Sequence, residues 1–123
     1  MAGNEYDALA TDLNLASVGM EVAMTQVFRA QGELFAADWR RNAAATSGKH
    51  GRHYPYSIES KLAIGRRGVA VATGPNPSKP QGGMSFEYGS KNQPPHLDGL
   101  RALPEAQARL IIAANATVRR LLP

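Results

Sequence analysis

The stretch from residue 17 to residue 45 constrains the fold most, because it contains no proline and consists mainly of alanine and long side chains. These residue types favour a helix. Its large apolar residues recur mostly at three-, four- and seven-residue steps, the spacing of one buried helical face. They are Met20, Met24, Val27, Phe28, Leu34, Phe35 and Trp39. The sequence therefore predicts one long amphipathic helix, preceded by a polar, flexible N-terminal arm at residues 1–13.

The length of this helix is informative about assembly. About 28 helical residues at 1.5 Å each span about 42 Å. A compact domain of 123 residues has a radius of gyration of about 14 Å, hence a diameter of about 35 Å. Either the helix bends or breaks, most easily at Gly32, or part of it extends beyond the domain. An extending apolar face would need a partner.

The middle of the chain predicts a small antiparallel sheet. Residues 56–64 and 69–73 alternate between two faces and are joined by a glycine-bounded turn, which indicates a hairpin. A ten-residue Pro/Gly loop follows at residues 74–83. Phe86 and Tyr88 then alternate with polar residues, so residues 84–88 are predicted to form a third strand.

The last part of the chain predicts a second helix. Asp98 can cap its first turn, and Pro104 fits the first turn of a further helical segment. Apolar residues then recur at helical spacing up to Leu121. We expect this helix to pack on the sheet, which gives a single α+β domain over residues 1–123: a long N-terminal helix, about three antiparallel strands and a C-terminal helix.

Several classes of protein are disfavoured by what the sequence lacks. It has no cysteine, so neither a disulfide framework nor a thiolate metal site is available. No apolar run approaches the roughly 20 residues that cross a bilayer, and the N-terminus lacks the basic start of a secretion signal. No nucleophile elbow, phosphate-binding loop or zinc-protease motif occurs. The sequence thus predicts no enzyme, no cofactor, no metal and no membrane partner.

Charge is unevenly distributed along the chain. Residues 1–39 hold six acidic residues and one arginine, whereas residues 40–123 hold thirteen basic and four acidic residues. Such a chain can complement a copy of itself or turn a basic surface toward DNA or an acidic partner. Tyrosines and histidines are interleaved with the first basic residues, as a nucleic-acid surface requires. The candidates for this basic surface are Arg40, Arg41, Lys49, Arg52, Arg66 and Arg67.

A rigid elbow follows the third predicted strand. Gly89 ends that strand, polar residues follow, and the pair Pro94-Pro95 can stay neither in a sheet nor in a helix interior. His96 and Leu97 then lead into the last helix. Taken alone, these residues also fit an ordinary connection between a strand and a helix.

The elbow carries a resemblance to a known family. Phe86-Glu87-Tyr88-Gly89-Ser90 and Pro94-Pro95-His96-Leu97 resemble the signature of the tail-completion (neck, head-tail joining) proteins of long-tailed bacteriophages. Gly51-Arg52 and Ser57-Ile58 match it more weakly, and the chain departs from the family pattern between these two pairs. In that family a long helix precedes a small antiparallel sheet, and the subunits form a ring between the capsid connector and the tail tube.

The resemblance implies a structural virion protein that forms a ring, of six copies by family analogy, in the neck. It would assemble in the host cytoplasm and contact a head connector or stopper on one side and a tail terminator or tail tube on the other. A tail terminator or another connector ring is the alternative within this class, and a small basic nucleic-acid-binding protein is the alternative outside it. The expected subunit and ring contacts are Phe86, Glu87, Tyr88, Gly89, Ser90, Pro94, Pro95, His96 and Leu97. On this hypothesis, Glu87→Lys or Pro95→Gly leaves the chain folded but blocks the joining of heads to tails.

Overall fold

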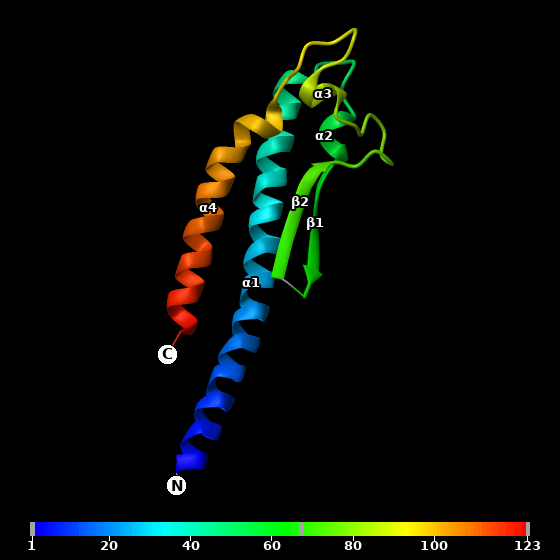
Figure 1. Ribbon diagram of the computed structural model, residues 1–123. Helices are drawn as coiled ribbons and strands as arrows, with labels where there is room; N and C mark the ends of the chain where they lie inside the picture. Colours follow the sequence, from blue (N-terminus) through cyan, green and yellow to red (C-terminus); the bar gives the residue numbers. More distant parts are fainter. Residues whose placement is uncertain (1, 67, 123) are drawn as a thin grey trace.

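The computed structural model describes residues 2–66 and 68–122, apart from the side chains of residues 2–6, 9 and 11–16. Two long helices and a hairpin lie side by side, so the α+β class is confirmed (Figure 1). The elements in chain order are α1 (Ala2–Thr46), α2 (Tyr54–Ser57), β1 (Ile58–Gly65), β2 (Gly68–Pro75), α3 (Ser85–Tyr88) and α4 (Asp98–Leu121).

The predicted long helix is confirmed, and it is uninterrupted. α1 comprises 45 residues, which at 1.5 Å per residue span about 68 Å. It neither ends nor breaks at Gly32, and its N-terminal end extends past the hairpin and past the end of α4 (Figure 1). The helix therefore extends beyond the rest of the domain, which was one of the two alternatives predicted from its length. The flexible arm at residues 1–13 stays a prediction.

Gly32 has a different role from the predicted bend. A Cβ at this position would lie 2.3 Å from Ser60 Oγ and 2.5 Å from Val71 Cγ2, closer than atoms can approach. The missing side chain thus lets both strands of the hairpin contact the backbone of α1. Gly32 fixes how closely the hairpin packs on the helix.

The predicted hairpin is confirmed, but the third strand is wrong. β1 and β2 pair antiparallel from Ile58 opposite Pro75 to Gly65 opposite Gly68, and the sheet formed by the described residues has these two strands. Residues 85–88 instead form the single helical turn α3, closed by the Tyr88 amide donating to the Met84 carbonyl at 2.9 Å. Five alternating residues cannot distinguish a short strand from one helical turn whose neighbouring side chains pack inward.

The core lies where α1, α2 and β1 meet. Its buried members are Ala36, Trp39, Ala43, Tyr54 and Ile58. α4 packs against α1 and the sheet, with most of its contact on α1, and Ala102 and Ala106 are its buried alanines. Small residues on both helices allow this close approach. The core therefore lies at the end of the molecule that carries the elbow, and it leaves the N-terminal half of α1 thinly covered.

Candidate functional site

The junction of residues 86–97, called the elbow from here on, is held to α4 by the carboxylate of Glu87. Its two oxygens accept hydrogen bonds from the amides of Gly99 (2.9 Å) and Leu100 (2.8 Å), and the residue is 2% exposed. These amides belong to the first turn of α4, where helical N–H groups have no partner within the helix and the helix dipole favours an anion. Glu87 is therefore a cap supplied from outside α4. Its burial is incompatible with the expectation that Glu87→Lys leaves the fold intact.

A second buried carboxylate, Asp98, ties α4 to the end of α1. Thr46 Oγ1 lies 2.9 Å from both of its oxygens, and Arg101 Nη2 lies 2.7 Å from Oδ1. The Asn42 side-chain amide donates to the Asp98 backbone carbonyl at 2.9 Å. His96 Nδ1 lies 3.8 Å from Asp98 Oδ2. This fully buried acid is thus surrounded by donors, and its ties fix the direction in which α4 leaves the elbow.

Aromatic rings fill the space beneath the elbow. Phe86 stacks on Tyr54 with ring centroids 4.6 Å apart, and Trp39 Nε1 donates to the Tyr54 hydroxyl at 3.2 Å. Gly99 lies directly on the Trp39 ring, where a Cβ would approach its atoms to 2.6 Å. Phe86 and Glu87, which we call the inner half of the elbow, are therefore part of the core.

Tyr54 gives a testable dependence of stability on pH. Burial raises the pKa of its hydroxyl to about 12 from the ordinary value of 10.0, and the carboxylates of Glu87 and Asp98 add to the increase while the Trp39 bond opposes it. The unfolded chain releases this proton first, so the contribution is complete below pH 10 and is lost as the pH rises to about 12. We expect the free energy of unfolding, measured in urea, to fall in this range. The fall should be smaller in Tyr54→Phe, and equal falls in both proteins would contradict the assignment.

Residues 88–95, which we call the outer half of the elbow, face solvent. Tyr88 is 65% exposed, Ser90, Pro94 and Pro95 are exposed, and residues 88–95 line a shallow hollow of about 660 Å³. The hollow keeps its shape because the Ser90 and Gln93 backbones bond to each other at 2.8 and 3.2 Å. Gly89 has φ +86 and lies against Pro95, a conformation that favours glycine. Of the predicted contact residues, Gly89, Phe86, His96 and Leu97 are half-buried, and only Glu87 is fully enclosed.

The predicted basic residues are distributed over separate regions. Arg40 Nε donates to the Ile58 carbonyl at 2.8 Å, and Arg41 forms an ion pair with Asp38. Both arginines therefore have partners within the fold. The other described members, which are exposed, are Lys49, Arg52 and Arg66.

Distance separates these exposed members. Arg66 follows β1 at the tip of the hairpin, whereas Lys49 and Arg52 lie in the loop after α1, near the other end of that strand. Eight residues of β1 at 3.3 Å per residue place the tip about 23 Å from Ile58. The described members therefore do not form one continuous surface, and Arg67 lies outside the described residues.

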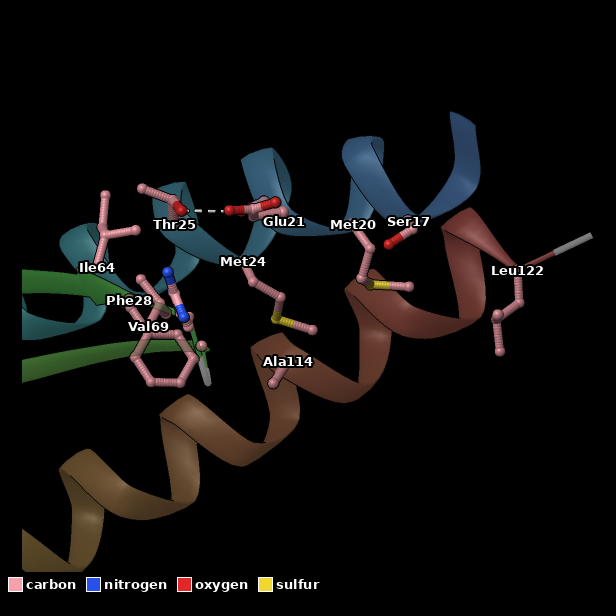
Figure 2. A pocket seen from close by; sticks show the side chains of 13 residues that line it. Ser17, Met20, Glu21, Met24, Thr25, Phe28, Ile64, Val69, Ala114 and Leu122 are labelled. Atoms are coloured by element: carbon pink, nitrogen blue, oxygen red, sulfur yellow. Dashed lines mark hydrogen bonds between the residues drawn. The ribbon is translucent and has the colours of Figure 1, made fainter. Parts of the chain in front are cut away.

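An apolar groove lies at the other end of the molecule, and sequence reasoning did not find it. It has a volume of about 790 Å³ and is bounded by α1 from Ser17 to Phe28, by the hairpin tip and by Ala114 and Leu122. Figure 2 shows Met20 and Met24 pointing from α1 toward α4, and Phe28 beside Val69. The sequence signal was present, since these residues belong to the predicted apolar face and an extending apolar face was expected to need a partner, but the sequence did not identify a groove.

The described residues do not assemble a metal site or a membrane span. Within residues 2–66 and 68–122, no three His, Cys, Asp or Glu side chains are placed to hold an ion. No helix in the same part of the chain combines the length and apolarity needed to cross a bilayer. The outer elbow and the groove are two features of the described residues that could engage a partner.

Comparison of the chain with protein-family models, with curated proteins and with solved structures finds no significant match.

Proposed function

We propose that this chain is the repeating subunit of a ring in the neck of a long-tailed bacteriophage, where it joins the DNA-filled head to the tail tube. The resemblance of residues 86–97 to tail-completion proteins supports this proposal. The order of elements also agrees with it, because a long helix, an antiparallel pair, an elbow and a second helix follow one another.

The observation that carries the proposal is the exposed area of the chain. The surface measures 8558 Å², whereas a compact protein of 13.2 kDa exposes about 6,400 Å². The excess is about 2,100 Å², and a subunit with two standard interfaces buries about 800 Å² in each. The excess exposed surface of this polypeptide is therefore large enough for interfaces with two neighbours, as a ring subunit needs.

Exposed aliphatic side chains point to the same conclusion. They occur on the N-terminal half of α1, at the hairpin tip and on α4 or directly after it, so they are not confined to one face. Those that are more than half exposed are Val18, Val22, Ile64, Leu100, Ile111, Ile112 and Leu122. Neighbouring copies would cover those that line the groove, Ile64 and Leu122.

The outer half of the elbow is the part of the subunit that we assign to the adjacent ring of the neck. It combines an exposed aromatic side chain with a backbone that glycine and proline hold in one shape, and rigid aromatic residues are the usual anchors of protein interfaces. The inner half fixes the elbow to α4. The position of the outer half therefore depends on the direction of α4. Six copies of the ring, and the connector or stopper and the tail terminator or tube as partners, follow from family analogy.

Tyr88→Asp tests this assignment. We expect the variant to stay folded, with a melting temperature close to that of the wild type, because the side chain is largely exposed. Each contact with the next ring should weaken by about 30-fold or more, since truncating an interface tyrosine typically costs about 2 kcal/mol. Phage carrying this change should therefore accumulate filled heads and free tails, counted by electron microscopy of lysates. Pro95→Gly should act in the same direction by loosening the elbow.

Tyr56→Asp is the matched control, because Tyr56 is also strongly exposed but lies on α2. It should leave joining intact. Normal infectious particles from Tyr88→Asp would count against the role of the elbow, and a mature particle with no copies at the head-tail junction would overturn the neck assignment. Tight binding of the monomer to free DNA, with a steep dependence on salt, would favour the nucleic-acid alternative.

A further inference from the structure

We infer that the apolar groove receives the N-terminal segment of α1, residues 2–16, from a neighbouring copy of this chain. The inference rests on the proposed ring and identifies the contact that joins its subunits. The groove is the α1–hairpin–α4 groove described above, and residues 2–16 are called the N-terminal segment.

The groove has the dimensions of a site for a short helix. Its wall on α1 runs from Ser17 to Phe28, which at 1.5 Å per residue is about 17 Å. Met20 and Met24 form its floor, and methionine adapts its shape to an incoming apolar surface. Ile64 and Leu122, at the edges, are 61% and 58% exposed. An occupant would cover them.

The chain cannot fill this groove with its own N-terminal segment. α1 is one helix from Ala2 to Thr46, so residues 2–16 continue along the same axis and lead away from the groove (Figure 1). That segment is about 22 Å long, enough to cover the whole groove of another copy. One subunit therefore has both a groove and a segment, and each of them can be used only with another copy of the chain.

The sequence of the N-terminal segment complements the groove. Tyr6, Leu9 and Leu13 recur at three- and four-residue steps, which is the spacing of one apolar helical face. The segment contains three acidic residues and no lysine or arginine. Of the charged residues that line the groove, Arg66 has the opposite sign and Glu21 has the same sign. The exposed Arg119 and Arg120 lie just before the lining residue Leu122 in the chain, so basic residues outnumber the acid around the rim of the groove. Apolar and electrostatic complementarity thus favour the same occupant.

In the proposed ring this contact is heterologous, because each subunit places its segment in the groove of the next subunit and receives the segment of the previous one. Heterologous contacts form rings when the rotation between subunits closes. Each subunit would donate one segment and accept one, which accounts for the two interfaces that its excess surface can supply. Electrostatic attraction between the segment and the rim would also orient subunits as they meet.

Cross-linking between two different variants tests the contact directly. The chain contains no cysteine, so Leu9→Cys and Ile64→Cys can be made in separate full-length proteins and mixed. We expect a short bis-maleimide to give a covalent dimer containing one copy of each variant. Ile112→Cys is the control for Ile64→Cys, because this isoleucine is 69% exposed but does not line the groove.

Assembly of charged variants provides the second measurement. Ile64→Asp should weaken self-association by at least about 30-fold in analytical ultracentrifugation, whereas Ile112→Asp should assemble more tightly than Ile64→Asp. Circular dichroism of both variants establishes that they are folded. Cross-links of Leu9→Cys to Ile112→Cys, cross-links only between Ile64→Cys copies, or a wild-type chain that stays monomeric at millimolar concentration would each overturn the inference. A ring that assembles normally with Ile64→Asp would overturn the groove contact alone, whereas absence from the neck of the particle would overturn the proposed function.

Discussion

Glu87→Lys is expected to lower the free energy of unfolding by about 3–5 kcal/mol, which corresponds to a fall in melting temperature of about 10–20 °C. The change removes both hydrogen bonds to the first turn of α4. It also places a cation in an enclosed site at the positive end of a helix dipole. The free energy of unfolding of small domains is only about 5–15 kcal/mol, so the substitution should remove a large part of it. Urea and thermal unfolding followed by circular dichroism measure the loss.

Two further variants separate the causes of this loss. Glu87→Gln keeps the shape and one acceptor oxygen, so we expect it to cost about 1–2 kcal/mol. Glu33→Lys makes the same charge change at an exposed position of α1 and should stay within about 0.5 kcal/mol of the wild type. A Glu87→Lys protein as stable as Glu33→Lys would show that Glu87 does not cap α4 in solution.

The two long helices and the hairpin were predictable because their signals are local and repeated. The apolar residues from Met20 to Trp39 cover several helical turns, and the hairpin has alternating residues on both sides of a glycine turn. The extension of α1 beyond the domain was anticipated as one of two alternatives. It followed from helix length alone, without knowledge of any contact.

The elbow shows where local patterns stop being sufficient. The sequence identified residues 86–97 as a junction, but it placed Glu87 on the outside and residues 84–88 in a strand. The partners of Glu87 are the amides of Gly99 and Leu100, twelve and thirteen residues further along the chain. A cap normally lies next to its helix, so no spacing rule connects this carboxylate to α4.

The groove was not predictable for a related reason. Met20, Met24 and Phe28 have the spacing of a buried helical face, and the sequence cannot tell how far the neighbouring elements cover that face. The coverage is decided by α4 and the hairpin tip, which border the groove without closing it. The basic residues were likewise grouped by their order in the chain, although the length of β1 separates them in space.

Gly32→Ala and Gly19→Ala are expected to change stability in opposite directions, although both replace a glycine inside α1. Alanine is the better helix former by about 0.8–1.0 kcal/mol. At position 19 an added Cβ would have no atom within 4 Å beyond its chain neighbours and the backbone of α1 itself, so that gain should be realised. At position 32 the added carbon would overlap with Ser60 and Val71. Such overpacking typically costs about 1–3 kcal/mol, and here it would push the hairpin away from the helix.

The helix-propensity gain applies at both positions, so the two variants should differ in urea unfolding by the overpacking cost, about 1–3 kcal/mol. A two-stranded hairpin is marginally stable by itself, so Gly32→Ala should also increase amide hydrogen exchange in β1 and β2 more than in α4. Because the hairpin tip supplies Ile64 and Val69 to the groove, self-association should weaken in Gly32→Ala and stay unchanged in Gly19→Ala. If both variants were stabilised equally, the hairpin would not contact α1 at Gly32, and the groove would lack the wall that the hairpin tip provides.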